Sequence, residues 1–241
     1  MDVITEPPVA VTPATEATAP PPAAISPVVA EAVRKYAVEL IGTFFLMFAV
    51  STSVLSGGTF TPLAAGATLM VMVYAGGHIS GGHYNPAVTM AVLVRGRIGG
   101  RDAVGYWIAQ IVGAVIAGAV ARAVVNPARV TTLTLAGHHM TAAALVELFI
   151  TFALAYVVLN VATSKDHPNN GFYGLAIGFT VAAGAFAVGG ISGGVFNPAV
   201  ALGGATAGIF AGSTIWVYLL AELAAGALAG VAFRVLNPGD K

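Results

Sequence analysis

The chain has 241 residues, of which 57% are hydrophobic and only 8% are charged, and its formal net charge at pH 7 is zero. Soluble domains contain about 45–50% apolar and about 25% charged residues, so this composition excludes a water-facing globular surface and indicates an integral membrane protein. Because the chain has no basic face and no cysteine, we expect no nucleic-acid partner, no disulfide, no thiolate metal site and no cofactor.

The N-terminal segment differs in composition from everything that follows it. Among Ala, Thr and Val it carries seven prolines, which are Pro7, Pro8, Pro13, Pro20, Pro21, Pro22 and Pro27. Such a segment buries too little apolar area to offset the entropy lost on ordering. We therefore expect residues 1–33 to be a disordered tail and residues 34–241 to form one membrane domain.

Six long apolar segments follow, each close to the ~20 residues that cross a ~30 Å hydrocarbon layer. Two further apolar pieces reach only about half of that thickness at ~1.5 Å per helical residue, so each must enter and leave on the same side. The six expected spans are 36–55, 61–79, 103–125, 142–162, 172–190 and 213–236, and the two short pieces are 85–94 and 197–207.

The ten basic residues favour one orientation of these spans. With a cytoplasmic amino terminus, only Arg122 and Arg129 lie outside. The eight that lie inside are Arg34, Lys35, Arg95, Arg97, Arg101, Lys165, Arg234 and Lys241. Because Lys and Arg gather at the cytoplasmic ends of spans, we expect both termini to be cytoplasmic and the membrane to be the plasma (cytoplasmic) membrane.

One segment occurs twice: ISGGHYNPAV from Ile79 returns as ISGGVFNPAV from Ile191, which places Asn85 and Asn197 112 residues apart. Matches at the same offset are Tyr106 with Tyr218, Gln110 with Glu222, Gly118 with Gly230 and Arg122 with Arg234, and ELIGTFF from Glu39 is similar to ELFITFA from Glu147. We interpret the chain as two repeats, about 36–127 and 142–238, each with three crossings and one half-crossing. Because three is odd, the repeats are inverted, and such repeats place a functional site near the midplane.

Asn-Pro suits the tip of a half-helix. Asn caps a helix start, Pro at the first helical position loses no hydrogen bond, and the Gly-Gly before each motif allows a tight turn. Non-helical backbone at membrane depth is tolerated only where it is buried in protein or lines a wet cavity. Two such loops that meet therefore favour a water-filled path over two capped helices in a dry bundle.

The expected path should hold water and repel cations. Each half-helix points the positive end of its dipole at the centre. Asn85 and Asn197 can each donate an amide N–H to a passing oxygen. A water that accepts from both amides has no lone pair left for a proton moving along the file.

HISGGHYNPAVT (His78–Thr89) and ISGGVFNPAVALG (Ile191–Gly203) resemble the paired Asn-Pro-Ala motifs of the aquaporin, or major intrinsic protein, family, and the resemblance covers roughly residues 36–237. It implies an all-α membrane protein with six tilted helices, two re-entrant half-helices and an inverted 3+3 repeat. It also implies a homotetramer in lipid, with one pore in each subunit. The residues it assigns to the pore centre are Asn85, Pro86, Ala87, Asn197, Pro198 and Ala199, and it assigns Glu39 and Glu147 to buried glutamates that accept hydrogen bonds from the re-entrant loops.

One position departs from the family pattern. Most relatives have Arg directly after the second Asn-Pro-Ala motif, and this chain has Val200. Family spacing places the other constriction positions at Ala65, Ala185 and Gly194, with Phe186 in place of Ala185 if the count slips by one residue. A small apolar constriction predicts a passive channel for water and small uncharged solutes such as glycerol, urea or ammonia. If Val200 blocks the path instead, the chain would be a non-conducting structural protein.

Two further alternatives are an enzyme and a coupled transporter. An intramembrane hydrolase needs a nucleophile with a base or a metal triad, but HExxH is absent and Ser80 and Ser192 lack an evident base. A secondary transporter also uses inverted repeats and broken helices. Coupling requires charged or polar groups at the breaks, whereas Glu39, Glu147 and Glu222 lie in expected helices. We therefore expect a channel and not an enzyme.

Overall fold

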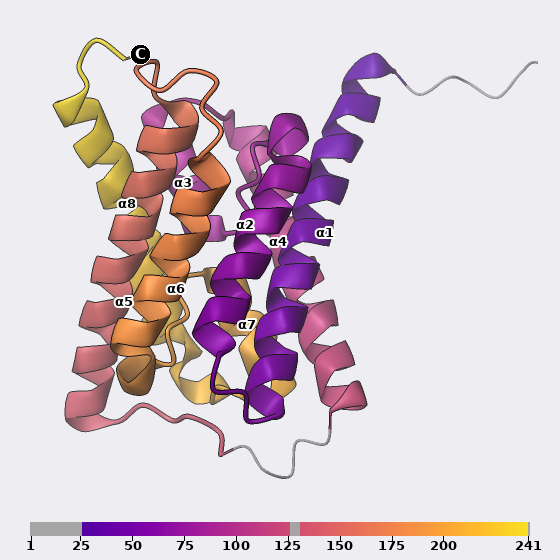
Figure 1. Ribbon diagram of the computed structural model, residues 1–241, viewed down its shortest axis with the longest axis vertical. Coiled ribbons are helices and arrows are strands. Elements are labelled where there is room, and N and C mark those ends of the chain that lie inside the picture. Colours follow the sequence, from indigo (N-terminus) through magenta and orange to yellow (C-terminus); the bar gives the residue numbers. More distant parts are fainter. Residues whose placement is uncertain (1–25, 126–130, 241) are drawn as a thin grey trace, which may run out of the picture.

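The computed structural model describes residues 26–125 and 131–240. Residues 1–25 of the expected tail therefore lie outside the described residues. Six of its helices are long and apolar enough to cross a membrane, and two of only ten residues, α3 and α7, are the half-helices (Figure 1). The expected fold class is confirmed. The helices are α1 (Pro27–Leu55), α2 (Thr61–Ser80), α3 (Pro86–Arg95), α4 (Gly100–Val124), α5 (Gly137–Val158) with the π-helical turn η2 (Leu159–Thr163), α6 (Tyr173–Ser192), α7 (Pro198–Ala207), the 3₁₀ turn η3 (Gly212–Thr214) and α8 (Ile215–Leu236).

The first helix begins earlier than the sequence predicted. Residues 27–33, which we expected to close the disordered tail, are the first turns of α1. The side chain of Ser26 caps the helix, and Pro27 stands at the start, where its fixed φ favours the helix and its missing N–H is not needed. One turn later Lys35 Nζ lies 2.7 Å from Glu31 Oε1, four residues before it. These local signals outweigh the proline-rich composition of the preceding segment.

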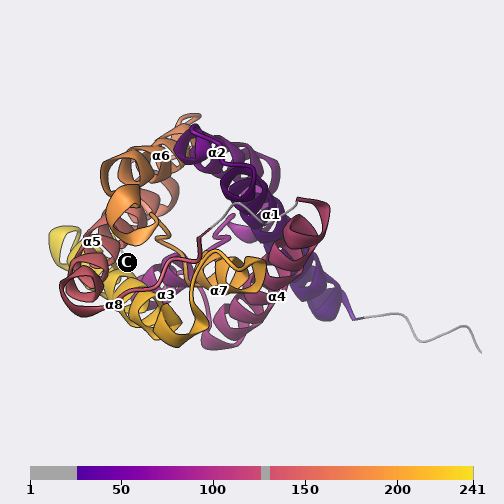
Figure 2. The ribbon, with the colours of Figure 1, turned by 90° about the horizontal axis from the view of Figure 1, so that it is seen from below.

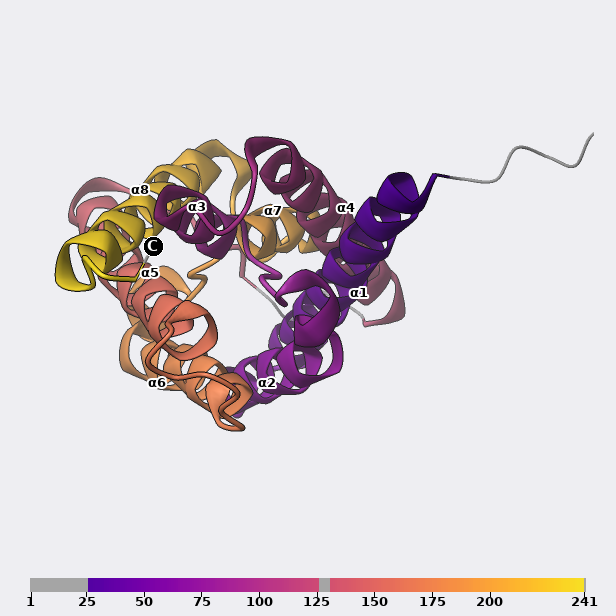
Figure 3. The same ribbon diagram turned by 90° about the horizontal axis from the view of Figure 1, so that it is seen from above.

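The six long helices form a ring when they are viewed along their length (Figures 2 and 3). Neighbours around the ring are α4, α1, α2, α6, α5 and α8 in that order. The two half-helices lie between α8 and α4, where α3 packs mainly against α8 and α7 mainly against α4. They complete the ring on that side and bring the two repeated motifs to its inner surface.

The crossing of α2 and α6 shows the inverted symmetry of the two repeats. Gly66 and Gly178 are 112 residues apart, the same offset as the two motif asparagines. A Cβ added to either glycine would clash with the backbone carbonyl of the other. Such close approach requires glycine, as is common where helices meet in membranes. The pseudo-two-fold axis therefore relates the two sides of this crossing as it relates the two motifs.

The start of α1 and the C-terminal end of the chain lie on the same face of the molecule (Figure 1). On the opposite face the connection between the repeats contacts the chain that follows α7. The Leu133 N–H donates to the Ile209 carbonyl at 2.8 Å, and the Ala211 N–H donates to the Leu133 carbonyl at 2.9 Å. We call these two sides the terminal face and the opposite face.

Most described basic residues belong to helix ends or connections on the terminal face, and Arg122, in the last turn of α4, belongs to the opposite face. Those near the terminal face are Arg34 and Lys35 in the first part of α1, Arg95 at the end of α3, Arg97 and Arg101 where α3 connects to α4, Lys165 after η2 and Arg234 in the last turn of α8. Arg129 and Lys241 lie outside the described residues.

A buried ion pair fixes the C-terminal end to the terminal face. Arg95 Nη2 lies 2.7 Å from Asp240 Oδ1, and Arg95 Nε donates to Thr163 Oγ1 in the π-helical turn at 2.7 Å. The Arg95 guanidinium also stacks 4.3 Å above the Phe233 ring. The Lys165 N–H donates to the other Asp240 oxygen at 2.9 Å. This backbone donor and the neighbouring Arg95 lower the pKa of Asp240 from 3.8 to about 2.

Candidate functional site

Each half-helix begins with the asparagine that the Asn-Pro pattern predicts as its cap. The Asn85 side-chain oxygen accepts from the Ala87 N–H at 2.8 Å, and that of Asn197 accepts from the Ala199 N–H at 3.0 Å. Both asparagines are extended, with φ of −157° and −159°, as N-cap residues are. The two tips therefore have the same local geometry.

The backbone before each cap turns through a series of left-handed residues. Gly81 and Gly193, which end α2 and α6, have φ of 89° and 94°. Tyr84 and Phe196, directly before the asparagines, have φ of 47° and 54°, which is uncommon for residues with a side chain. Strain of this kind persists only where the surroundings determine the conformation, and it is concentrated at functional sites.

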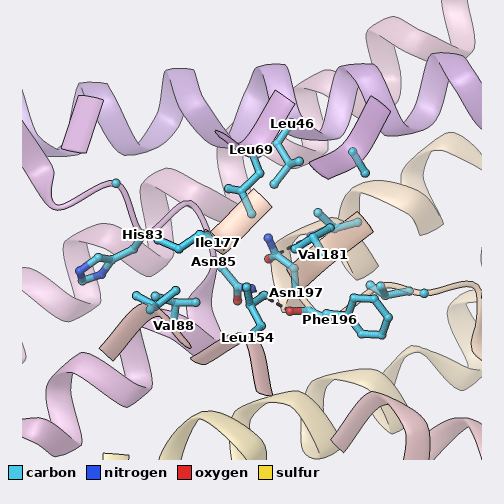
Figure 4. A pocket seen from close by; sticks show the side chains of 16 residues that line it. Leu46, Leu69, His83, Asn85, Val88, Leu154, Ile177, Val181, Phe196 and Asn197 are labelled. Atoms are coloured by element: carbon cyan, nitrogen blue, oxygen red, sulfur yellow. Dashed lines mark hydrogen bonds between the residues drawn. The ribbon is translucent and has the colours of Figure 1, made fainter. Parts of the chain in front are cut away.

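The two tips are joined by hydrogen bonds between the repeats. Asn85 Nδ2 donates to the Phe196 carbonyl at 2.7 Å, and Asn197 Nδ2 donates to the Tyr84 carbonyl at 2.9 Å. Figure 4 shows the two asparagines side by side, with His83 toward one end of the path and Phe196 toward the other. An amide nitrogen carries two hydrogens, so each asparagine keeps one N–H for another acceptor. The sequence predicted the asparagine donors but not this reciprocal bond.

Glu39 accepts hydrogen bonds from the end of α2, from the first loop and from α4. Its Oε1 accepts from the Ser80 hydroxyl at 2.7 Å and the His83 N–H at 2.9 Å. Its Oε2 accepts from the Tyr84 N–H at 2.7 Å and the Gln110 side-chain amide at 2.8 Å. Four donors, from the end of α2, the first loop and α4, thus converge on one fully buried carboxyl group of α1.

Glu147 does the same for the second loop. Its Oε1 accepts from the Ser192 hydroxyl at 2.6 Å and the Val195 N–H at 2.9 Å, and its Oε2 accepts from the Phe196 N–H at 2.7 Å. The Tyr218 hydroxyl, from α8, donates to the Ser192 carbonyl at 2.6 Å. Glu39 and Glu147 thus each accept backbone hydrogen bonds from one re-entrant loop.

The remaining motif residues are buried in the first turns of α3 and α7. Ala87 and Ala199 have no exposed surface, and the Pro86 carbonyl accepts from the Trp107 ring N–H at 3.1 Å. Pro86, Ala87, Pro198 and Ala199 are not among the residues that line the central cavity described next. They fix the position and direction of the half-helices.

A narrow cavity of about 30 Å³ lies between the two asparagines and the inner surface of the ring (Figure 4). This volume exceeds the ~10–15 Å³ that is needed to hold one water molecule. Its polar side chains are those of His83, Asn85 and Asn197. The apolar side chains that complete it are those of Leu46, Ala65, Leu69, Val88, Leu154, Val158, Ile177, Val181, Val195, Phe196 and Val200.

His83 is the one titratable residue among the described residues that line this cavity. Its ring Nδ1 lies 3.0 Å from Thr89 Oγ1, and the ring packs edge-on against Tyr106 with 5.1 Å between centroids. These contacts hold the side chain against α3 and α4.

Four loop residues bring unpaired backbone carbonyls to this path. No described residue donates a hydrogen bond to the carbonyls of Gly82, His83, Gly194 or Val195, all of which line the central cavity. Buried backbone carbonyls need a partner, and irregular backbone at membrane depth is tolerated where it lines water. The carbonyls therefore favour a hydrated path.

A larger cavity of about 440 Å³ opens toward the opposite face, and we call it the outer vestibule. Ala65, Gly194, Val195 and Val200 line both this vestibule and the central cavity, so they stand at the junction between them. Ala185 and Phe186 line only the vestibule. Of these two, Ala185 faces Gly194, because a Cβ added to Gly194 would lie 3.3 Å from the Ala185 Cβ. The junction is thus small and apolar.

A third cavity, of about 250 Å³, lies on the terminal face, where the connection between α5 and α6 meets the end of α2. Its large polar lining residues are His78, His167, Asn169, Asn170 and Tyr173. In the described part of the chain no group of three or more His, Cys, Asp or Glu side chains is arranged to hold a metal ion.

Two inverted repeats whose capped half-helices meet beside an uncharged cavity define a channel protein of the membrane. The family model described as major intrinsic protein matches residues 26–233, and the chain belongs to this family. Its members pass water and small solutes passively, and this chain is such a channel and not an enzyme.

Individual relatives agree with this assignment. The chain is 42% identical to glycerol uptake facilitator protein-like 6 of Lactiplantibacillus plantarum, over 86% of this chain and 100% of that one. It is 38% identical to the probable aquaporin TIP2-1 of Oryza sativa subsp. japonica, over 85% of this chain and 88% of that one. The fold is similar to that of the aquaglyceroporin from Plasmodium falciparum, with a TM-score of 0.73 and 21% identity. The match covers 86% of this chain and 98% of that one.

Proposed function

We propose that this channel is wide enough at its constriction to pass glycerol, urea or ammonia as well as water. The observation that carries the proposal is the junction formed by Ala65, Gly194, Val195 and Val200, with Ala185 beside it. None of these side chains is larger than valine, and none carries a charge or a hydrogen-bonding group. A solute with a carbon skeleton therefore meets apolar surface there, and its polar groups face the loop carbonyls and the two asparagines.

Selectivity against cations rests on the half-helices in this proposal. The N-terminal ends of α3 and α7 meet at Asn85 and Asn197, so the positive ends of both dipoles are directed at the path. With Val200 in place of an arginine, these dipoles and the two spare asparagine N–H groups are the features that oppose a cation. The name of the Lactiplantibacillus plantarum relative, a glycerol uptake facilitator protein-like 6, supports the glycerol part of the proposal.

The test is solute uptake by liposomes that contain the purified protein. Osmotic shrinkage and reswelling are followed by light scattering for water, glycerol and urea, with empty liposomes as the control. We expect all three to enter faster than in the control, at rates that do not respond to an ion gradient or a membrane potential. Rapid water entry without glycerol or urea entry would contradict the wide constriction. If the rates respond to ion gradients, the result would favour a coupled transporter. If neither water nor solute enters, it would favour a structural protein.

We propose further that the protein is a homotetramer in the plasma (cytoplasmic) membrane with both termini in the cytoplasm. Basic residues on the terminal face support the orientation through the positive-inside rule. Large exposed apolar side chains such as Ile108, Phe149 and Leu220 on the outside of the ring suit contact with lipid or with other subunits. Mass measurement in detergent and reporter fusions at each terminus test the assembly and the orientation separately.

A further inference from the structure

Glu222, in the middle of α8, is fully buried, and neither of its carboxyl oxygens meets a hydrogen-bond donor among the described residues. The polar groups nearest to it include the carboxyl group of Glu147 and the backbone N–H of Asn197, which lies outside hydrogen-bonding geometry. A buried carboxyl group beside a second carboxyl group is costly unless something compensates it. Neither family membership nor the channel activity accounts for an acid here.

The first repeat shows what a residue at this position does. Gln110 precedes Glu222 by the repeat offset of 112, and its Nε2 donates to Glu39 Oε2 at 2.8 Å and to Thr89 Oγ1 at 3.0 Å. Glu39 thereby has four donors. Glu147 has three donors, from Ser192, Val195 and Phe196, and Glu222 lies where the fourth would be.

Among the described residues no Lys or Arg is placed to neutralise the acid pair. In the described structure α8 packs against α3, α5, α7, η2 and η3. Glu147 is the one acidic residue on α5, and the histidines of α5, His138 and His139, lie exposed in its first turn, more than two turns before Glu147. The elements α7, η2 and η3 carry no titratable side chain. Arg95, on α3, pairs with Asp240 and Thr163 at the terminal face instead. Two carboxylates in contact would therefore repel each other in a buried, low-dielectric site.

We propose that Glu222 is a positioning residue that carries a proton and donates it in a hydrogen bond to Glu147. A carboxylic acid has one O–H donor, so it can replace the amide donor that Gln110 supplies in the first repeat. Glu147 in turn holds the N–H groups of Val195 and Phe196, next to Asn197. A shared proton thus completes the support of the second re-entrant loop, and an amide completes that of the first.

The test is infrared spectroscopy of the lipid-reconstituted protein, in which a protonated carboxyl group and a carboxylate absorb at different frequencies. At pH 8 exposed carboxyl groups are ionised. We expect Glu222→Gln to lose the intensity of one carboxylic acid from the wild-type spectrum and Gln110→Glu, its counterpart in the first repeat, to gain that of one. Equal carboxylic-acid intensity in wild type and Glu222→Gln would overturn the proposal.

Water permeability is the second measurement, and this arm alone rests on the proposed function. Glu222→Gln should keep the wild-type rate, because its amide also donates to Glu147. Glu222→Leu should lower the rate several-fold, because Glu147 loses its fourth donor. If Glu222→Gln is as impaired as Glu222→Leu, the donor role is wrong. If the wild-type protein passes no water, the channel proposal fails while the infrared result still decides the protonation of Glu222.

Discussion

Asn85 Nδ2 lies 2.7 Å from the carbonyl oxygen of Phe196, so the tip of one half-helix is bound to the loop that precedes the other. In the second repeat, 112 residues later, Asn197 Nδ2 donates the equivalent hydrogen bond to the Tyr84 carbonyl. The two Asn-Pro-Ala motifs are therefore one unit, in which each asparagine caps its own helix, holds the opposite loop and retains one N–H. A substitution at either asparagine should affect both the stability of the loops and the chemistry of the path.

Asn85→Asp separates these roles. A carboxylate still accepts the Ala87 N–H, so the cap remains, but it cannot donate to Phe196 and it adds a negative charge beside the cavity. We expect a cation leak that wild type lacks and a loss of about 1 kcal/mol of stability from the missing bond. Ion flux into liposomes measures the leak. Asn237→Asp, which makes the same change at the end of α8, is the control and should leave ion flux at the wild-type level. If the Asn85→Asp variant shows no cation leak, residue 85 does not face the path.

Val200→Arg tests the constriction. The side chain of residue 200 lies between the outer vestibule and the central cavity, so a long cationic side chain should fill the junction. We expect glycerol and urea entry to fall more than water entry in the liposome assay. Val200→Met, which is also long but uncharged, separates the effect of volume from that of charge. A solute profile unchanged in both variants would place residue 200 away from the path.

Gly193→Ala should destabilise the protein. The φ of 94° at Gly193 is unfavourable for alanine, and its Cβ would meet the Phe210 ring at 2.7 Å. The left-handed conformation alone costs about 1–2 kcal/mol for a residue with a side chain. Gly189→Ala is the matched control, because it lies in the last turn of α6 with nothing near its added Cβ. Thermal unfolding in detergent should show a lower midpoint for the first variant only, and equal midpoints would argue against strain at this turn.

Asp240→Asn should weaken the attachment of the C-terminal end in a pH-dependent way. The pKa of Asp240 is depressed from 3.8 to about 2, so its contribution is present above about pH 4 and is lost as the pH falls through about 2. At pH 7 the variant should unfold at a lower temperature than wild type, and the difference should shrink between about pH 4 and 2. Asp166→Asn, in the connection between α5 and α6, is the control and should match wild type throughout. A pH-independent difference would show that the charge of Asp240 is not responsible.

Much of the fold could be predicted because its signals are local or repeated. Span length and composition gave six crossings, and the Asn-Pro pattern gave the two half-helix starts at residues 85 and 197. The offset of 112 indicated which residues would be equivalent, and Tyr106 and Tyr218 indeed make equivalent bonds, each donating at 2.6 Å to the serine carbonyl that ends the preceding long helix of its repeat.

Other features have no local signature. The pairing of Arg95 with Asp240 joins residues 145 apart, and the π-helical turn where Arg95 also binds has no sequence pattern of its own. The positive φ of Tyr84 and Phe196 follows from contact between the two loops and not from residue type. The early start of α1 does have a local signal, because Ser26 followed by Pro27 is a typical helix start. The proline-rich segment before it predicts disorder, and that prediction extended too far, to residue 33.

The central claim is that solutes pass between the two half-helix tips and the ring, and because the chain has no natural cysteine, a single introduced thiol tests it most directly. Val200→Cys protein in liposomes is treated with a small thiol-specific reagent, and water permeability is measured before and after. Val120→Cys, on the outer surface of α4, is the control. We predict that modification of residue 200 reduces permeability to that of empty liposomes while the control is unaffected. Complete modification of residue 200 with no change in permeability would contradict the account.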